Sequence, residues 1–385
     1  MDKRVYLFTV LAFIVGMVEL IIGGILDLVA EDLHISIGQA GILITVFSLV
    51  FAIAGPLLIV ATAGLERRKL TLLALMVFLF GNLLAVFSGS YTLLMASRVV
   101  TAASGALLTM LSIIMASRIV KREYIGRAIG IVIMGISGSI VLGLPIGLVL
   151  GHEFGWRAPF ILITLLTVLL MLTVYFFMSE IEPEEAVPLR EQLRTLRSSK
   201  ILFAHLTTFL FVGGHFTFYA YFTPFINSEL GMSGSVVSGI YFVFGLAAVA
   251  GGGLGGMLTD RLGSQRVVLL VTAIFAVTLF VLPFTAKVFL LFMFIVLIWG
   301  IMSWTITPPM QSYLIEVAPE VAATHQSLNN SALHFGIAFG SLIGSIVIEK
   351  ATVTTNALVG SGIVLLALFA AIFSFSRKPL SQEVV

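Results

Sequence analysis

The sequence predicts an all-α integral membrane protein with 12 transmembrane helices in two pseudo-symmetric six-helix bundles. Hydrophobic residues make up 59% of the 385 residues, charged residues make up only 10%, and the mean hydropathy is +1.14. A soluble domain carries roughly 25% charged residues, so this chain cannot cover itself with a water-compatible surface. Apolar runs of about 20 residues recur along the chain, and each is long enough to cross a bilayer.

These apolar runs are predicted to be helices, because backbone groups in lipid must form hydrogen bonds within their own segment. Twelve segments meet this description: 5–29, 38–62, 70–88, 92–117, 127–149, 157–178, 201–226, 237–258, 267–285, 288–312, 327–348 and 355–376. The first follows Lys3 and Arg4, but it is longer than the apolar region of a signal peptide and contains Glu19. We therefore interpret it as a retained first helix.

Cationic residues are distributed unevenly over the predicted connections. If the N-terminus is cytoplasmic, 17 of the 21 Lys and Arg residues lie on the cytoplasmic side, three lie outside and Arg98 lies within a span. Cytoplasmic loops carry such an excess of positive charge. The sequence thus predicts a multi-pass protein with both termini in the cytoplasm.

The longest polar stretch divides the spans six and six. We expect an N-terminal bundle at 1–178, a cytoplasmic linker at 179–200 and a C-terminal bundle at 201–385. Three arginines recur at helical spacing within the linker. It is therefore interpreted either as a solvated connection or as an amphipathic helix on the membrane surface.

The two halves also resemble repeats of one six-helix unit. Rows of three glycines occur at an offset of 193, in the fifth and eleventh spans: Gly143, Gly147 and Gly151 against Gly336, Gly340 and Gly344. Small residues every four positions allow two helices to approach closely, and Pro145 interrupts the hydrogen-bond ladder nearby. We expect Gly143, Pro145 and Gly147 to belong to an interface that moves as the halves rock.

A carboxyl group, Glu19, lies about two-thirds along the first span, where a charge costs at least ~2.5 kcal/mol. It lies roughly 21 Å from one membrane face and Arg98 lies roughly 10 Å from the other, so both have similar depth in a core of ~30 Å. Burial favours the neutral carboxyl, and a nearby guanidinium favours the carboxylate. We therefore predict that Glu19 and Arg98 form a proton-coupling site, with a permanent ion pair between two helices as the alternative.

Three motifs carry a family resemblance. The loop after the eighth span reads Gly256-Met-Leu-Thr-Asp260-Arg261-Leu-Gly263-Ser-Gln-Arg266, the fourth span contains Arg98, and the fifth reads Gly143-Leu-Pro145-Ile-Gly147. Together they resemble the major facilitator superfamily, in its drug:proton antiporter-like branch, and imply that superfamily's fold.

The same resemblance implies a role for the loop after the eighth span. Asp260, with Arg261 and Arg266, is expected to hold the cytoplasmic side closed. The loop after the second span lacks the acidic residue expected near Ala63, so such a latch is predicted in the C-terminal half.

Further stretches resemble bacterial purine base and nucleoside efflux pumps. They read His215-Phe-Thr-Phe-Tyr219 in the seventh span and Trp299-Gly-Ile-Met-Ser-Trp304 in the tenth, whereas Asp27 departs from the pattern. The resemblance implies export of adenine, hypoxanthine or related ribosides across a bacterial inner membrane.

An uncharged heteroaromatic substrate needs flat apolar surfaces and a few hydrogen-bonding partners. We expect these from six residues: Asn82, His215, Tyr219, Trp304, Gln311 and Asn330. Trp304 and Gln311 lie seven residues apart on one face of the predicted tenth helix, and His215 lies at an offset of 196 from Glu19. Each also has a structural alternative, since aromatic residues anchor at membrane interfaces and buried amides join helices.

The sequence contains no phosphate loop, metal-ligand cluster, nucleophile–base pair or cysteine. We expect no cofactor and no enzymatic activity. The expected partners are a small-molecule substrate, protons and the lipid bilayer, without nucleic acid, and we expect a monomer. The favoured function is a proton-coupled exporter of purines; a multidrug or sugar exporter, an intramembrane enzyme and a channel are the alternatives.

Overall fold

The computed structural model describes residues 1–385 except 1, 3, 122–123, 184–188 and 378–385. This part of the chain contains 12 helical segments long and apolar enough to cross a membrane, which confirms the predicted class and number of spans. The chain divides into two compact units. Unit 1 comprises Met1–Val187 and Gly234–Phe242, and unit 2 comprises Pro188–Ser233 and Val243–Val385.

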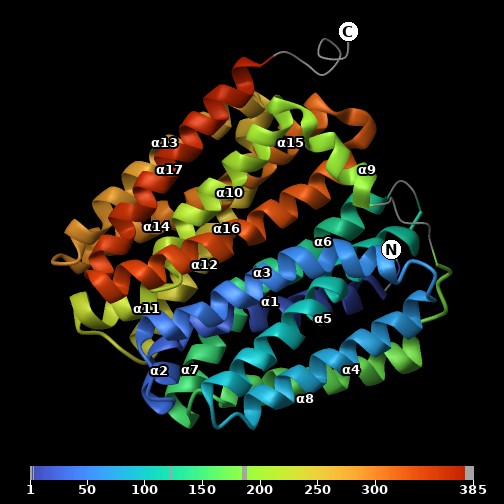
Figure 1. Ribbon diagram of the computed structural model, residues 1–385, viewed down its shortest axis with the longest axis horizontal. Coiled ribbons are helices and arrows are strands. Elements are labelled where there is room, and N and C mark those ends of the chain that lie inside the picture. The colour runs from blue at the N-terminus through green and yellow to red at the C-terminus, as the bar shows by residue number, and fades with distance from the viewer. Residues whose placement is uncertain (1, 3, 122–123, 184–188, 378–385) are drawn as a thin grey trace. The chain divides into compact units, whose positions relative to one another are not determined.

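Unit 1 contains the first six spans (Figure 1). They are α1 (Arg4–Gly24), α3 (Ile37–Ala61), α4 (Arg67–Val86), α5 (Tyr91–Arg118), a fifth span made of α6 (Ile125–Gly138), η2 (Ser139–Gly143) and α7 (Leu144–Phe154), and α8 (Ala158–Phe177). The short helix α2 (Leu26–Asp32) follows α1. Helix α1 contacts α3, α5, α6 and α8 and is buried along most of its length, so it forms the centre of this unit.

Unit 2 contains the remaining spans, although the first turns of α12 belong to unit 1. Its elements are α9 (Leu189–Arg194), η3 (Thr195–Arg197), α10 (Ser199–Tyr219), α11 (Phe222–Phe225), η4 (Ile226–Leu230), α12 (Ser235–Leu262), α13 (Ser264–Thr285), α14 (Phe289–Thr305), α15 (Thr307–Val317), η5 (Pro319–Val321), α16 (Ala322–Lys350) and α17 (Val353–Ser376). Helix α10 packs along both α16 and α17.

Several spans that the sequence predicts as single helices are interrupted near prolines. Helix α10 ends before Pro224, and α14 ends before Pro308. The fifth span changes to a π-helical turn, η2, directly before Pro145. A proline cannot donate to the carbonyl four residues before it, and its ring displaces that carbonyl. These spans lie where predicted, but the regular α-helical hydrogen bonding of each is interrupted.

The first helix also ends earlier than predicted. The sequence predicts a helix over 5–29, whereas α1 ends at Gly24 and Asp27 belongs to the separate helix α2. Gly23 and Gly24 precede this break, and glycine is a weak helix former. Glu19 and Asp27 therefore lie on different helical segments.

The end of α2 is fixed by an acidic residue that the sequence analysis assigned no role. Asp32 Oδ2 accepts a hydrogen bond from Trp156 Nε1 at 2.9 Å and forms an ion pair with Arg157 Nη1 at 3.0 Å. The hydrogen bond from Trp156, together with the Arg157 charge, holds the pKa of Asp32 below its usual range. This contact joins α2 to the beginning of α8.

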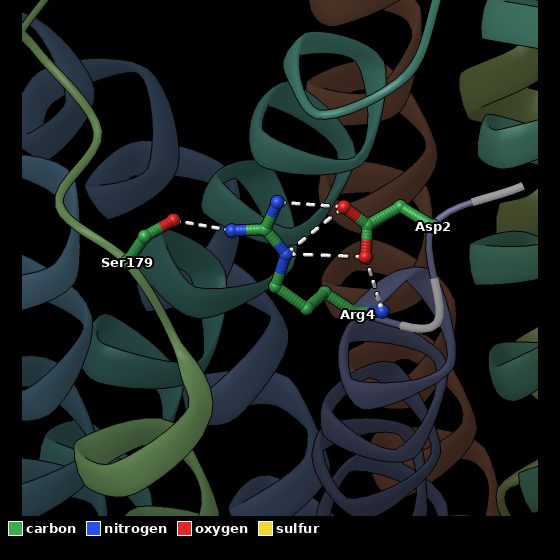
Figure 2. Close-up of polar contacts among 3 residues, drawn as sticks. All are labelled: Asp2, Arg4 and Ser179. Atoms are coloured by element: carbon green, nitrogen blue, oxygen red, sulfur yellow. Dashed lines mark hydrogen bonds and ion pairs between the residues drawn. The ribbon is translucent and has the colours of Figure 1, made fainter.

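The first residues of the predicted linker are bound to unit 1. The Arg4 guanidinium binds the Asp2 carboxylate, with Nη2–Oδ2 at 2.6 Å, and also donates to Ser179 Oγ (Figure 2). Arg118 Nη1 donates to the carbonyl of Glu182 at 3.0 Å. Ser179 and Glu182 are thus anchored to the start of α1 and the end of α5. Neither a solvated connection nor an amphipathic surface helix predicts this anchoring.

Glu66 is the centre of this anchoring. Its carboxylate caps α4 by accepting from the backbone N–H groups of Arg68 and Lys69 at 2.7 and 2.8 Å. It also accepts from the N–H of Ile181 at 3.0 Å, and the Ile181 carbonyl accepts from the N–H of Arg67 at 3.0 Å. Partial burial alone would raise the pKa of Glu66, but the three N–H donors outweigh it and lower the pKa.

We predict that Glu66→Gln lowers the thermal unfolding midpoint of the protein in detergent at neutral pH. Loss of a helix cap costs about 1 kcal/mol, and this residue also binds the linker. Because the folded-state pKa is lowered, the stabilisation is complete above the unfolded pKa of about 4.3 and is lost as the pH falls through the folded pKa. The difference between wild type and variant should therefore shrink below about pH 4.

Glu182→Gln is the matched control, because it removes the same charge from an exposed side chain. The contact of Glu182 with Arg118 is made by its backbone carbonyl, which the substitution keeps. It should leave the midpoint unchanged. Equal midpoints for the Glu66 and Glu182 variants would contradict the assignment.

Candidate functional site

The interior of unit 1 contains a fully buried guanidinium. Arg98, on α5, has 0% of its surface exposed. Its Nη1 donates to the carbonyl of Val18 on α1 at 2.9 Å, and its guanidinium carbon lies 4.0 Å from the ring centroid of Phe47 on α3. The Nε and Nη2 atoms have no hydrogen-bond partner among the described residues. Arg98 thus joins three helices and still has donor groups to offer.

Glu19 follows Val18 directly and is partly exposed. Its carboxyl group interacts electrostatically with Arg98. The two residues predicted to form the coupling site are therefore neighbours inside unit 1. Their role in proton coupling stays a prediction.

Asn82, a predicted substrate contact, is completely buried on α4. Its Nδ2 donates to the carbonyl of Phe78 in the same helix at 2.8 Å, and its Oδ1 has no partner in the described part of the chain. Next to it, Ser97 Oγ donates to the carbonyl of Gly81 at 2.8 Å. The asparagine therefore lies at a close contact between α4 and α5, near the level of Arg98.

Unit 2 contains an aromatic cluster, defined here as His215, Tyr219, Phe244, Phe275 and Trp299. The His215 and Tyr219 rings stack at 5.0 Å with 22° between their planes. Trp299 lies 5.4 Å from His215 and 4.7 Å from Phe244, measured between ring centroids. Four helices contribute, α10, α12, α13 and α14, and each ring is at least nine-tenths buried.

Two polar atoms of the aromatic cluster lack partners. His215 Nδ1 and Trp299 Nε1 form no hydrogen bond with the described residues, although these side chains are only 8% and 0% exposed. Buried polar atoms in proteins are nearly always hydrogen-bonded. The cluster therefore combines flat rings with two groups that can bind a polar ligand atom.

The other predicted substrate contacts lie on three helical segments of unit 2. Trp304 lies in the last turn of α14, which ends at Thr305, whereas Gln311 lies on α15. The predicted single helix is thus divided into two segments at Ile306. Trp304 is partly exposed, Gln311 is exposed, and Asn330 on α16 is partly buried. Their part in substrate binding stays a prediction.

Two members of the aromatic cluster, Phe244 and Phe275, were not predicted from the sequence, and Trp304 was preferred to Trp299 as a stacking residue. The chain contains 31 phenylalanines, so these two carry no signal of their own. Trp299 belongs to the same resembling stretch as Trp304. The helix break between them could not be placed without the tertiary structure.

The predicted latch residues Asp260, Arg261 and Arg266 are all exposed. The contact that the structure describes for this loop is a hydrogen bond from Ser264 Oγ to Glu316 Oε2 of α15 at 2.8 Å. Glu316 therefore binds this loop, a contact that was not predicted from the sequence.

The glycine rows pack inside each unit. A Cβ on Gly147 of α7 would overlap Ile21 of α1, and a Cβ on Gly340 of α16 would overlap the carbonyl oxygen of Gly213 on α10. Gly143 also faces α1, and Pro145 follows the π-helical turn. The rows therefore set the helix spacing within a unit, and their role in movement between the halves stays a prediction.

A sequence model of the Major Facilitator Superfamily matches residues 8–341 and 204–384. The "Uncharacterized MFS-type transporter YbcL" of Bacillus subtilis (strain 168) is 32% identical over 376 residues, which cover 98% of this chain and 96% of that protein. A "Probable sugar efflux transporter" of Helicobacter pylori (strain J99 / ATCC 700824) is 26% identical over 366 residues, covering 95% and 93%.

Two solved structures share the fold at low sequence identity. An inward-facing, unoccupied bacterial homolog of the human lysosomal transporter Spinster superposes with a TM-score of 0.77 at 16% identity, covering 97% of both chains. A D-xylose-proton symporter superposes with a TM-score of 0.76 at 15% identity, covering 98% of both. At these identities the likeness shows the fold alone.

We predict that Gly340→Ala destabilises the protein, because the overlapping atom belongs to the backbone of α10 and cannot rotate away. Overpacking of this kind costs roughly 1–3 kcal/mol, so the thermal unfolding midpoint in detergent should fall.

Gly362→Ala on α17 is the matched control, because a Cβ there meets nothing within 4 Å. Alanine is the better helix former by roughly 0.5–1 kcal/mol, so this variant should unfold at the wild-type temperature or above. A Gly340 variant as stable as the Gly362 variant would refute the close helix contact.

Proposed function

The chain belongs to the Major Facilitator Superfamily and is a transporter of small molecules, and we propose that it exports purine bases or nucleosides in exchange for protons. The observation that carries proton coupling is a carboxyl group, Glu19, inside a membrane span beside the buried Arg98. An ionisable residue within a span is a functional site by default, because burial without a function is costly.

Arg98 can respond to the charge of Glu19. It is held through the Val18 carbonyl and the Phe47 ring, and its Nε and Nη2 remain available as donors. An ionised Glu19 accepts such donors strongly, whereas a protonated carboxyl binds a guanidinium weakly. Proton binding therefore changes the interaction between α1 and α5, which gives the transporter two states to alternate between.

The aromatic cluster of unit 2 supports a planar substrate. A purine presents flat faces and ring nitrogens, which suit the aromatic faces, His215 Nδ1 and the Trp299 indole N–H. The rings touch one another in this structure, so we propose that one of them, such as Tyr219 or Phe244, moves aside when substrate binds.

A sugar is the second candidate, because relatives over most of the chain are described as probable sugar efflux transporters. A sugar carries many hydroxyl groups and needs several polar partners. The aromatic cluster offers two unpartnered polar atoms among the described residues, which favours a heteroaromatic substrate over a sugar.

Purified protein in proteoliposomes with an imposed pH gradient tests the proposal. Concentration of labelled adenine or hypoxanthine against its gradient, and no concentration of sugars, would support purine export. Uphill movement of sugars alone would replace purines by the second candidate. Transport of purines that ignores the pH gradient would contradict proton coupling.

We predict that Glu19→Gln abolishes accumulation driven by a pH gradient, reducing it to the level of vesicles without a gradient. The amide imitates the protonated carboxyl, so exchange of labelled for unlabelled substrate should persist, because exchange requires no proton release. Glu31→Gln, an exposed carboxylate on α2, is the matched control and should transport normally.

The double variant Glu19→Gln with Arg98→Gln separates coupling from structure. An unpaired buried charge is costly, so a purely structural pair would show poor folding in the single variant and recovery of both folding and gradient-driven transport in the double variant. A folded Glu19→Gln protein that still concentrates substrate would rule out coupling by this residue.

A further inference from the structure

Two histidines meet in the interior of unit 2, away from the aromatic cluster. His205 on α10 and His325 on α16 are 6% and 0% exposed. Their Nε2 and Nδ1 atoms lie 3.4 Å apart, and their ring centroids lie 5.6 Å apart. His205 precedes His215 by ten residues, which is roughly 15 Å along a helix. We call these two residues the histidine pair.

The two outer nitrogens of the histidine pair have no partner in the described part of the chain. They are Nδ1 of His205 and Nε2 of His325. A neutral imidazole has one N–H donor and one bare nitrogen. If one ring donates to the other, the pair retains one outer N–H and one bare outer nitrogen, whichever ring is the donor. The pair therefore always has one nitrogen free to accept a proton.

Uncharged groups surround the histidine pair. Thr208 Oγ1 donates to Asn329 Oδ1 at 2.8 Å, and the Asn329 side chain lies beside His205. Asn329 can turn either its oxygen or its amide hydrogens toward an imidazole. A positive or a neutral pair therefore finds a suitable neighbour.

The charged groups on the adjoining elements are engaged elsewhere or exposed. Lys200 Nζ donates to the Arg377 carbonyl at 2.9 Å, and Glu316 accepts from Ser264. The remaining ones with described side chains are exposed on α9, η3, η5, at the end of α16 and after α17: Arg190, Arg197, Glu320, Glu349, Lys350 and Arg377. Tyr313 on α15 bonds with Ser374, and His334 lies nine residues further along α16. The charge of the pair is thus set by the two rings themselves.

We propose that the histidine pair is a proton-binding site of unit 2 that holds one proton and is separate from Glu19. A proton added to the bare outer nitrogen leaves the central N–H···N bond in place and shares the positive charge between both rings. A second proton would occupy the nitrogen that accepts the central bond, and would set two positive rings against each other. The geometry therefore gives one proton for two histidines.

A metal ion is the competing ligand for two imidazoles at this spacing. Protein zinc sites use three or four protein ligands. The described residues contain no group of three His, Cys, Asp or Glu side chains able to hold a metal. A proton needs only the two nitrogens, and it is the ligand that this site suits.

The proton affinity of the pair depends on the packing of α10 against α16. The central bond exists only while the two rings stay at hydrogen-bond distance, and Gly340 sets the spacing of the same helices further along. A movement that separates the rings changes their proton affinity. By linkage, proton binding then favours the helix arrangement that keeps the rings together.

Nitrogen-15 spectroscopy of histidine-labelled protein tests the proposal without any transport measurement, so its outcome is independent of the purine assignment. Coupling between two imidazole nitrogens across the N–H···N bond identifies the pair in the wild-type protein. From about pH 8 to about pH 4, a range that includes the ordinary histidine pKa of ~6.5 and extends well below it, the two rings should shift in one joint transition that corresponds to one proton.

Proton uptake measured over the same pH range gives the count. The double variant His205→Gln with His325→Gln should take up one proton fewer than the wild type. The control His34→Gln, which removes an exposed histidine, should leave the joint transition unchanged.

Rings whose signals stay unchanged over this range, or a double variant that loses two protons or none, would overturn the proposal. Broadening of the pair's signals by added Zn²⁺ with no response to pH would instead identify a metal site and overturn it as well. Because the wild-type spectra are decisive by themselves, a variant that fails to fold does not remove the test.

Discussion

A permanently charged guanidinium inside a membrane bundle is the constraint on which unit 1 depends. Arg98 cannot lose its charge in a protein, so its surroundings must compensate for the loss of water. The structure supplies the backbone carbonyl of Val18, which has a second lone pair to give, and the face of Phe47. These contacts tie α5 to α1 and α3. Glu19 follows Val18 directly in the chain. A proton bound or released by the Glu19 carboxyl group therefore changes the charge beside this arginine.

The aromatic cluster of unit 2 contains no carboxylate, ammonium or guanidinium group. His215 lies at the repeat position of Glu19, but it stacks on Tyr219 and touches Phe244, Phe275 and Trp299. The two units thus place different chemistry in their interiors. A charged residue pair suits the exchange of protons, and a cluster of rings suits the recognition of a planar molecule.

The loops that join the second and third spans of each half also make different contacts. In unit 1, Glu66 caps α4 and binds Ile181 at the start of the linker. In unit 2, Ser264 begins α13 and donates to Glu316 on α15. The first loop lacks the acidic motif residue near Ala63. Each connection nevertheless makes a hydrogen bond in which a carboxylate is the acceptor: Glu66 accepts from the Ile181 N–H, and Glu316 accepts from Ser264 Oγ. Both connections are therefore fixed to their own unit.

The sequence by itself determined the class of the protein, the number of its spans and the level of its buried charges. These follow from hydrophobic length and helical rise, which are local properties of the chain. The tertiary structure alone decided which side chains meet. Arg98 reaches a carbonyl 80 residues away, Glu66 binds a residue 115 positions away, and His205 and His325 are 120 positions apart. Such contacts leave no local pattern, because a helix that is apolar on every side does not reveal which face it turns to its neighbours. The prolines were visible in the sequence, but only packing determined where the helices around them are interrupted. One interruption places Trp304 and Gln311 on different segments, α14 and α15. Trp299, on α14, packs in the aromatic cluster.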